Sequence, residues 1–333
     1  MDNQDLLTKD IFDKKHNLTM VDIFCGAGIG AVGFKEAGYK IKYAVDNSQY
    51  AVDTYNKNIG NHAHCKDVTK LPFDDIPEAD VYTAGFPCQP FSVAGSGLGV
   101  EDPKAGNLGN YFLNLVKEKK PRAFIIENVK GITSTKNYPF FNSLIDSFIA
   151  SGYKVSWKLI NCHHYGVPQL RERVFMVGVR DEGKRFIFPE PIKEELRLSI
   201  RDAIGDLPDP SSDHSIFNHK EFYTGGFSSR FTSRNRQKQW DEPSFTICSS
   251  ARQLPLYPEP ANYDIREHRE FTQDAPRRFT VRECLRLQTA PDTFHFDECI
   301  PFMKQHIRCS GIPSRIAYLI SLELARLIEN DDT

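Results

Sequence analysis

The first 180 residues alternate short apolar runs, typical of buried strands, with stretches whose apolar spacing is typical of helices. Strands and helices in alternation predict a parallel sheet with crossover helices, because parallel neighbours need a long connection. The predicted fold class is therefore α/β, a doubly wound and mostly parallel sheet. The predicted strands are 20–24, 41–45, 81–84, 123–126, 155–160 and 174–179, and the predicted helices are 30–37, 50–56, 111–117 and 140–151.

The sequence changes character after about residue 180. Prolines cluster, polar residues become more frequent, and regular periodicity fades until 280–287 and 312–328. Only short strands such as 244–248 are expected between these points. This pattern predicts a second, smaller and irregular domain ahead of the final helix. The predicted domains are 1–180, 181–297 and a C-terminal segment, 298–333, that packs back on the first domain.

Composition restricts the class of protein and its surroundings. The chain has 333 residues and a net charge of -2, so any nucleic-acid surface has to be local. Its eight cysteines are dispersed, with no pair at a zinc-ligand spacing, which favours free thiols in a reducing compartment and no metal site. The N-terminal ten residues do not resemble a signal peptide, and no apolar run approaches the roughly 18 residues of a membrane span. We expect a cytoplasmic protein.

A glycine-rich turn follows the first predicted strand. Gly28, Gly30 and Gly33 satisfy the pattern G-x-G-x-x-G between that strand and a helix. Glycines there let the backbone approach a ligand, and amides at a helix start can bind polar ligand atoms. The turn alone fits a nicotinamide, a flavin or S-adenosylmethionine, or a purely structural packing turn.

Two aspartates follow the next strands. Asp46 ends the second predicted strand, where a carboxylate can accept both hydroxyls of a ribose. Asp67 follows a third short strand, although a lone aspartate there is more often a turn or helix-cap residue. Because successive parallel strand ends line one crevice, we expect the two carboxylates at the same edge of the sheet.

A cysteine between two prolines follows the strand 81–84. Cys88 stands in Gly-Phe-Pro-Cys-Gln-Pro-Phe-Ser, a stiff loop at the carboxyl end of that strand. One interpretation is a small buried apolar side chain, and the other is a positioned thiolate nucleophile. A nicotinamide oxidoreductase has no use for such a loop.

Pro87-Cys88-Gln89 resembles the catalytic motif of the DNA (cytosine-5) methyltransferase family, in particular its bacterial type II restriction-modification members. Supporting motifs of that family occur in the same order along the chain, and the resemblance covers nearly all of it except roughly 181–226. These motifs are the cofactor loop at 22–28, the Glu-Asn-Val motif at 127–129, the arginine motif at 169–173, and the motif at 282–288 that borders the recognition domain.

The resemblance implies a Rossmann-like S-adenosylmethionine-dependent methyltransferase with a smaller irregular target-recognition domain. It implies that Cys88 adds to C6 of a flipped-out cytosine in duplex DNA, so that C5 can take a methyl group. Glu127 would bind N3 and the exocyclic amine of that cytosine. Arg171 and Arg173 would hold the ring oxygen and the DNA backbone beside the target.

The resemblance also assigns the cofactor pocket. Phe24 would pack on the adenine, Asp46 would bind the ribose, Asp67 would bind the adenine amine, and Leu108 would wall the pocket. S-adenosyl-L-homocysteine would be the product. The predicted cofactor-binding residues are Phe24, Gly26, Gly28, Asp46, Asp67, Pro87, Leu108 and Ser310.

The sequence departs from the family pattern at two places. Ile29 stands where the cofactor loop usually has a second glycine. The final motif reads Cys309-Ser310-Gly311-Ile312-Pro313, without the asparagine that the family has before Val-Pro. Ser310 is expected to take the place of that asparagine with a shorter side chain.

A basic stretch in the irregular region is the candidate DNA surface. Residues 228–240 carry four basic side chains and no acidic one before Asp241, although such a run can also be a solvated face. The segment that follows resembles a branch of the family that reads short GC-rich palindromes such as GGCC. The predicted DNA-binding residues are Gln89, Ser92, Arg234, Arg236, Arg252 and Gln253.

The expected partners are double-stranded DNA and a cognate restriction endonuclease, with no membrane partner. The expected location is the cytoplasm, at the bacterial nucleoid when the protein is bound to DNA. Two alternatives stay open: a catalytically weak DNA-binding relative, motivated by the altered final motif, and an RNA cytosine-5 methyltransferase.

Overall fold

The structure, a computed structural model, describes residues 16–86, 103–180, 183–226, 229–266 and 275–329. These residues form two compact units. The sheet unit takes its described residues from 16–161, 172–190 and 317–329, and the irregular unit takes its own from 162–171 and 191–316. The domain limits expected at residues 180 and 297 stay a prediction.

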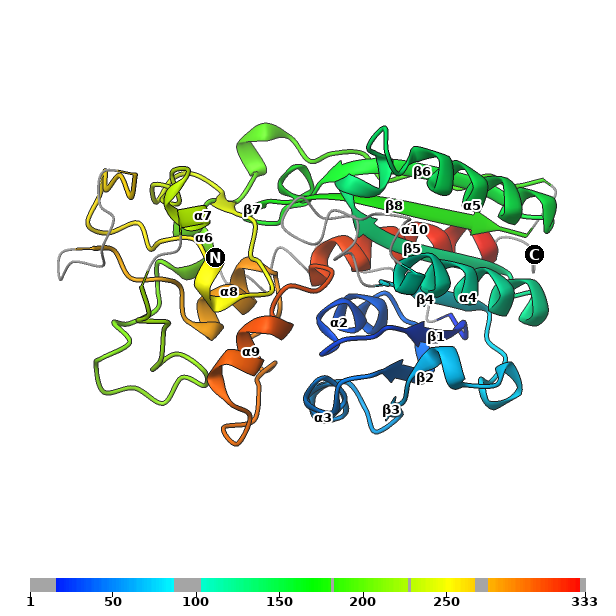
Figure 1. Ribbon diagram of the computed structural model, residues 1–333, viewed down its shortest axis with the longest axis horizontal. Helices are drawn as coiled ribbons and strands as arrows, with labels where there is room; N and C mark the ends of the chain where they lie inside the picture. The colour runs from blue at the N-terminus through cyan, green and yellow to red at the C-terminus, as the bar shows by residue number, and fades with distance from the viewer. Residues whose placement is uncertain (1–15, 87–102, 181–182, 227–228, 267–274, 330–333) are drawn as a thin grey trace. The chain divides into compact units, whose positions relative to one another are not determined.

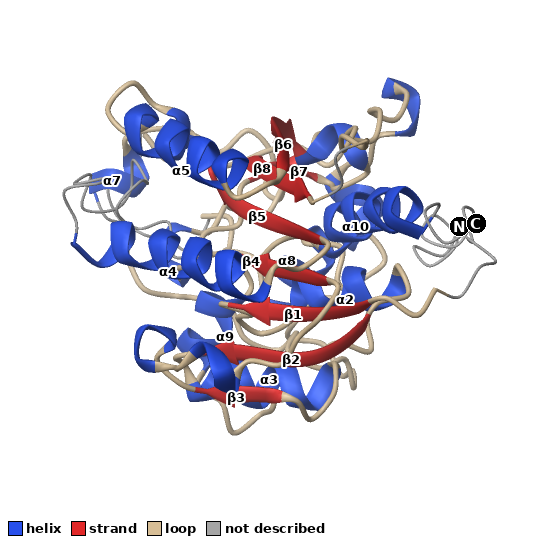
Figure 2. Cartoon of the chain, turned by 90° about the vertical axis from the view of Figure 1, so that its right-hand side faces the viewer, coloured by secondary structure: helices blue, strands red, loops and turns tan. Residues whose placement is uncertain are grey.

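The sheet unit is built on one seven-stranded sheet in the order β3-β2-β1-β4-β5-β8-β6, which Figure 2 shows. Strands β1 to β5 pair in parallel, and β8 is antiparallel to both of its neighbours, so the expected mostly parallel sheet is confirmed. The strands are β1 (Thr19–Ile23), β2 (Lys40–Asp46), β3 (Ala63–Cys65), β4 (Val81–Ala84), β5 (Ala123–Val129), β6 (Lys154–Asn161) and β8 (Glu172–Val179).

Helices cover both faces of this sheet. In Figure 2, α4 and α5 lie on one side of the strands, and α2 and α10 lie on the other. None of the helices that the structure describes combines the length and apolarity needed to cross a membrane. The helices are α2 (Ile29–Glu36), α3 (Gln49–Asn58), α4 (Pro103–Lys119), α5 (Tyr138–Ala150) and α10 (Ser314–Glu329), and the 3-10 turns are η1 (Val68–Lys70), η2 (Phe73–Asp75) and η4 (Lys130–Thr133).

The direction of winding reverses at β1. This strand pairs with β2 on one side and with β4 on the other, and Ile23 at its carboxyl end is level with Ala84 of β4. Two neighbouring strands whose connections leave in opposite directions open a crevice at their carboxyl ends, where ligands bind in folds of this class. The cofactor loop follows β1 and the segment that leads to Cys88 follows β4, so both start at this reversal.

The irregular unit consists of short elements joined by long connections (Figure 1). Its only sheet among the described residues is the two-stranded parallel pair β7-β9, so the expected strand 244–248 pairs over two residues alone. The elements are η5 (Cys162–Tyr165), β7 (Gln169–Leu170), η6 (Glu194–Leu196), α6 (Ile200–Ile204), α7 (Ser229–Thr232), β9 (Ser244–Phe245), η7 (Ala251–Gln253), α8 (Val281–Leu287) and α9 (Phe302–Arg308).

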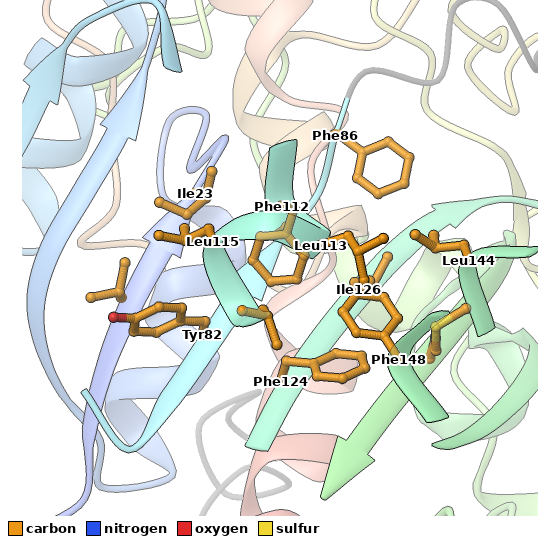
Figure 3. Packing of buried hydrophobic residues seen from close by; sticks show 14 of the residues in the cluster. Ile23, Tyr82, Phe86, Phe112, Leu113, Leu115, Phe124, Ile126, Leu144 and Phe148 are labelled. Carbon is orange, nitrogen blue, oxygen red and sulfur yellow. The ribbon is translucent and has the colours of Figure 1, made fainter. Parts of the chain in front are cut away.

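An aromatic cluster between the sheet and the α4–α5 face anchors the sheet unit. The ring of Phe124 on β5 lies 4.1 Å from that of Phe148 and 6.3 Å from that of Phe112, centroid to centroid (Figure 3). Gly178 lies opposite Phe124 in the β5–β8 register, and a Cβ built there would be 2.1 Å from the Phe124 ring. The ring therefore fills the space that a side chain at 178 would need.

We predict that Gly178→Ala lowers the free energy of unfolding by about 1–3 kcal/mol, because the added methyl group overpacks a filled core. Urea unfolding of the purified protein measures this change. Gly226→Ala is the matched control, since a Cβ at 226 meets nothing within 4 Å, and its effect should stay within about 0.5 kcal/mol. Equal unfolding midpoints for Gly178→Ala and the unchanged protein would contradict the packing described.

Candidate active site

Three residues of the turn after β1 have left-handed backbone conformations. Phe24, Gly26 and Gly28 have φ values of 62°, 55° and 91°. A Cβ at Gly28 would lie 2.9 Å from side-chain atoms of Tyr55 and Ile59, so this position accepts only glycine without rearrangement. A Cβ at Gly26 would meet nothing within 4 Å. The backbone at Gly26 therefore faces open space that a ligand can enter.

Ile29, the departure from the family's cofactor loop, is the first residue of α2 and is 2% exposed. Its side chain belongs to the core of the sheet unit. The substitution for glycine is therefore accommodated by burial, while Gly28 keeps the left-handed conformation next to it.

Asp46 ends β2 with its carboxylate fixed by two backbone amides. The N–H of Gly26 donates to its Oδ2 at 3.1 Å, and the N–H of Ser48 donates to its Oδ1 at 2.9 Å. A carboxylate has about four acceptor positions, so it can still accept hydroxyl groups. Asp46 therefore joins the glycine turn to the next strand and suits the predicted ribose contact.

Asp67 follows β3 and is exposed. Its Oδ1 accepts from the backbone N–H and the hydroxyl of Thr69, at 3.1 and 2.7 Å, and so caps η1. The hydrogen bond from the Thr69 hydroxyl lowers the pKa of the Asp67 carboxyl most, and the one from the Thr69 backbone N–H lowers it further. An ionised carboxylate held at a strand end is a suitable acceptor for an amine, as predicted for the adenine.

Apolar side chains lie beside the glycine turn. The ring of Phe24 stands edge-on to that of Phe86, with 6.4 Å between centroids, and Leu108 of α4 is partly buried against the same core. A pair of acceptors, an apolar wall and an open glycine backbone together fit a cofactor with an adenine and a ribose. The carboxyl edge of the sheet unit is therefore the candidate site for such a cofactor.

Buried polar groups lie beneath the turn. Asp22 on β1 is 6% exposed, and burial, together with the charge of Asp46, raises its pKa to about 8. Burial, together with the charges of Asp22 and Asp46, raises the pKa of the Cys25 thiol. The buried hydroxyl of Tyr55 has no hydrogen-bond partner among the described residues. The protein therefore holds an unionised carboxyl under the cofactor turn near neutral pH.

Glu127 and Arg173 form an ion pair at the carboxyl end of β5. Nε of Arg173 lies 2.9 Å from Oε1 of Glu127, and the two side chains are only 14% and 13% exposed. Glu127 lies inside β5, which runs on to Val129 beyond the strand predicted over 123–126, and Arg173 lies on the antiparallel partner β8. The pair fixes the carboxylate in a largely desolvated place where a charge-assisted contact is strong.

Asn128 is a functional candidate that the sequence reasoning missed. It is 2% exposed, and its Nδ2 donates to the carbonyl of Phe86 at 3.5 Å, while its Oδ1 accepts from Val129 N–H at 2.9 Å. Phe86 stands two residues before Cys88 in the sequence. Asn128 thus ties the end of β5 to the segment that leads into the cysteine loop, and its place inside Glu-Asn-Val was the available signal.

Pro87, Cys88, Gln89 and Ser92 lie outside the described residues. Their predicted roles in catalysis, cofactor binding and DNA binding therefore stay predictions.

Arg171, two residues before Arg173, belongs to the irregular unit and is 1% exposed. Its Nη1 donates to the carbonyl of Ile247 at 3.2 Å, and its Nη2 donates to those of Ser310 and Gly311 at 2.6 and 3.0 Å. The predicted contact of Arg171 with substrate stays a prediction. In the structure its guanidinium donates hydrogen bonds to backbone carbonyls. Of the two arginines, Arg173 belongs to the sheet unit and Arg171 to the irregular unit.

The altered final motif is held through its backbone. Nε2 of Gln288 donates to the carbonyls of Cys309 and Gly311 at 2.7 and 3.2 Å, beside the contacts from Arg171. The hydroxyl of Ser310 donates to the carbonyl of Ile307 at 3.3 Å. The side chains of Arg171 and Gln288 thus fix the backbone carbonyls of the turn 309–311 by hydrogen bonds, so its shape does not depend on an asparagine side chain.

The predicted DNA-reading side chains differ in exposure. Arg234 and Arg252 are exposed, and Gln253 is partly buried. Arg236 is half-buried, its Nε donates to the carbonyl of Phe231 at 3.0 Å, and burial lowers the pKa of its guanidinium. Arg234 and Arg252 are therefore more accessible to a partner than Arg236.

The segments that carry these side chains run side by side. Gln237 and Leu256 form a parallel β-bridge, and Leu256 N–H donates to the carbonyl of Arg236 at 2.9 Å. Arg234 stands three residues before Gln237, and Gln253, in the 3-10 turn η7, stands three residues before Leu256. The bridge therefore joins the segment that carries Arg234 and Arg236 to the segment that carries Arg252 and Gln253.

No three His, Cys, Asp or Glu side chains gather to hold a metal ion within the described parts of the chain.

Comparison with known proteins defines the family. The C-5 cytosine-specific DNA methylase family matches residues 18–320. The chain is 41% identical to the type II methyltransferase M.MthTI of Methanothermobacter thermautotrophicus, over 84% of this chain and 88% of that protein. It is 34% identical to the type II methyltransferase M.FnuDI of Fusobacterium nucleatum, over 95% and 96%. The Dnmt2 methyltransferase structure of S. pombe shares its fold, with a TM-score of 0.71, 20% identity, and 93% and 99% covered.

The sheet order and the likeness to the Dnmt2 structure define a Rossmann-like α/β fold. The chain belongs to the C-5 cytosine-specific DNA methylases. It is accordingly an enzyme whose family methylates C5 of cytosine in DNA with S-adenosylmethionine as the methyl donor, as the sequence predicted.

We predict that Asp22→Asn flattens the dependence of stability on pH. The unfolded Asp22 ionises near its ordinary pKa of about 4, whereas the folded carboxyl keeps its proton to about pH 8. Between these values the folded state binds more protons, so the free energy of unfolding falls as pH rises, by up to about 1.4 kcal/mol per pH unit.

Urea unfolding of Asp22→Asn and the unchanged protein between about pH 5 and about pH 7.5 measures the difference. Asp74→Asn, which removes an exposed carboxyl, is the control and should keep the original slope. Parallel profiles for Asp22→Asn and the unchanged protein would show that Asp22 is ionised in the folded state.

Proposed function

We propose that this enzyme methylates C5 of a flipped-out cytosine in a short specific sequence of duplex DNA, through a covalent bond between Cys88 and C6. The observation that carries the proposal is the Glu127–Arg173 pair at the end of β5. It stands beside β4, which leads to Cys88, at the edge that carries the glycine turn. The strand that leads to Cys88, the strand that carries Glu127 and the cofactor loop therefore end or begin at one edge of the sheet.

The cofactor residues act by binding and orientation. S-adenosylmethionine supplies an electrophilic methyl group. Phe24, Leu108 and Pro87 would enclose the adenine, Asp46 would accept from the ribose hydroxyls, and Asp67 would accept from the adenine amine. Gly26 and Gly28 would leave room for the cofactor beside the turn, and Ser310 would stand in for the family asparagine.

Cys88 starts the reaction as a thiolate. Its sulfur bonds to C6, the electron pair of the C5–C6 double bond moves to C4–C5, and the displaced C4–N3 pair takes a proton at N3 from the Glu127 carboxyl. The ring is then nucleophilic at C5, which takes the methyl group and leaves S-adenosyl-L-homocysteine. Loss of the C5 proton to solvent, cleavage of the sulfur–C6 bond and return of the N3 proton to Glu127 restore the ring and free the thiolate.

Arg173 keeps the Glu127 carboxylate in place for this step. A side chain held by an ion pair and little exposed needs small reorganisation when charge develops on the ring. Arg171 would contribute by fixing the backbone at Ser310 and Gly311. Both arginines would thus support catalysis: Arg173 by orienting Glu127, and Arg171 by fixing the backbone of the motif 309–313.

The irregular unit would recognise the target sequence. Arg234 and Arg252 are exposed, and arginine can pair in bidentate fashion with guanine in the major groove. A GC-rich palindrome such as GGCC is our candidate site, because the segment that begins at Trp240 resembles the branch of the family that reads such sites. Gln253 would contribute hydrogen bonds, and Arg236 would support the loop. Gln89 and Ser92 would lie near the space vacated by the flipped base, whose extrusion costs a few kcal/mol.

The biological setting follows from the relatives, which are named type II methyltransferases. We propose a cognate restriction endonuclease that cuts the same site when it is unmethylated. The enzyme would then act in the cytoplasm on chromosomal DNA.

We predict that methyl label from S-adenosylmethionine enters C5 of cytosines in mixed-sequence duplex DNA, and that Cys88→Ala abolishes the transfer. Cys299→Ala, which removes an exposed cysteine of the irregular unit, is the matched control and should keep full activity. Bisulfite sequencing of the product maps the recognition sequence.

Folded protein that binds DNA but transfers no label would contradict the proposal and identify a DNA-binding relative without activity. Label in tRNA but not in duplex DNA would show that the substrate is RNA and not DNA. Activity of Cys88→Ala equal to that of Cys299→Ala would remove Cys88 from the mechanism.

A further inference from the structure

The stretch Arg277–Phe279 lies against both segments that carry the candidate DNA readers. Leu256 forms an antiparallel bridge with Arg278, and Tyr257 N–H donates to the carbonyl of Arg277 at 2.7 Å. Leu256 is also the partner of Gln237. A single backbone position therefore joins the reader segments to the stretch that leads into α8.

The side chain of Arg278 is buried beneath these segments, with none of its surface exposed. Its Nη1 donates to the carbonyls of Gly225 at 3.0 Å and Tyr223 at 3.4 Å. Its Nη2 donates to the carbonyls of Gly226 at 3.4 Å and Arg252 at 3.5 Å. One guanidinium thus connects the segment 223–226 to η7, the turn that carries Arg252 and Gln253.

Two aromatic rings hold the guanidinium in this position. Its central carbon lies 4.7 Å from the ring centroid of Phe231 and 4.8 Å from that of Tyr223. Phe231 is fully buried and also lies 5.0 Å from the guanidinium carbon of Arg236. The same ring therefore contacts Arg278 and the segment that presents Arg234.

We propose that Arg278 is a positioning residue for sequence recognition, which sets the direction of the Arg252 side chain by holding the Arg252 carbonyl against the segment 223–226. The inference rests on the proposed function, in which Arg252 reads a base. An exposed side chain takes its direction from its backbone, and an arginine–guanine contact requires both nitrogens in register with the base edge. A loosened η7 should therefore reduce discrimination between bases more than overall DNA affinity.

Lysine cannot replace Arg278 in this role. Arginine presents two terminal nitrogens in a rigid plane, so it reaches 225 with one and 252 with the other, whereas lysine has a single nitrogen. Arg278→Lys keeps the positive charge and most of the apolar stem. The variant therefore removes the bridge between two segments with a small change in composition.

Arg277 provides the matched comparison. It is the preceding residue, it lies over the ring of Tyr257 at 3.8 Å, and its guanidinium pairs with Glu283 at 2.8 and 2.6 Å. Among the described residues its side chain contacts Glu283, the carbonyl of Arg278 and the rings of Phe222 and Tyr257, none of them in η7. Arg277→Lys should therefore perturb packing and stability without redirecting Arg252.

The test uses the full-length enzyme and a library of duplexes with randomised base pairs around a central cytosine. Methylation followed by bisulfite sequencing gives the base preference at each position for the unchanged protein, Arg278→Lys, Arg277→Lys, Arg252→Gln and the double variant Arg278→Lys/Arg252→Gln. Circular dichroism melting of each variant reports folding.

We predict that Arg278→Lys lowers the preference at one base pair of each half-site about tenfold, the scale of one bidentate contact. Arg252→Gln should lower the preference at the same base pair, and the double variant should be no worse than Arg252→Gln. Arg277→Lys should keep the original preference even if its melting temperature falls.

Two results would overturn the inference in distinguishable ways. If Arg252→Gln changes preference but Arg278→Lys does not, or if their effects add, Arg278 does not act through Arg252. If Arg252→Gln leaves every preference unchanged while methylation proceeds, the reading role proposed for Arg252 is wrong, and the positioning role is wrong with it.

Discussion

The pairing of β1 with β2 on one side and β4 on the other is the constraint from which the active edge follows. It makes the winding reverse at β1, so the connections after β1 and β4 leave in opposite directions and their strand ends stay uncovered by a crossover. The glycine turn, Asp46 and the segment before Cys88 are delivered to this edge by chain connectivity. The buried core of Figure 3 keeps β4 and β5 in the register that sets these ends level.

The antiparallel strand β8 adds what a purely parallel sheet could not supply. Its register brings Arg173 opposite Val129, and the Arg173 guanidinium pairs with Glu127, two residues before the strand end. The neighbouring Asn128 points to the Phe86 carbonyl, since successive residues of a strand face opposite sides. Two adjacent residues of β5 therefore have different roles: Glu127 is the proposed acid, and Asn128 fixes the segment that leads to the cysteine loop.

In the irregular unit, Arg171, Gln288 and Arg278 have a common function, because each donates hydrogen bonds to backbone carbonyls of loops that lack regular structure.

The alternation of apolar runs and helices was sufficient to predict the sheet, and the strand 81–84 agrees with β4 at both ends. The extension of β5 through Glu127 was missed because its last residues are polar, and the ion pair with Arg173 depends on an antiparallel register that periodicity does not contain. Arg171 and Arg173 were assigned together because both belong to the arginine motif at 169–173. The strand is interrupted at Arg171, between β7 and β8, so the two side chains enter different units. Contacts through backbone carbonyls, such as those of Arg278, leave no pattern in a sequence, since every residue has a carbonyl.

The central claim is that Glu127, held by Arg173, assists attack of the Cys88 thiolate on C6. A duplex with 5-fluorocytosine at the mapped target, incubated with S-adenosylmethionine, tests it, because after methyl transfer the fluorine at C5 cannot leave as a proton does and the covalent complex accumulates. The account predicts that Glu127→Gln slows this accumulation by about a hundredfold or more, the scale of a lost general acid. Glu172→Gln removes a neighbouring exposed carboxylate paired with Lys130 and should leave the rate within about twofold. Accumulation by Glu127→Gln at the rate of Glu172→Gln would contradict the account.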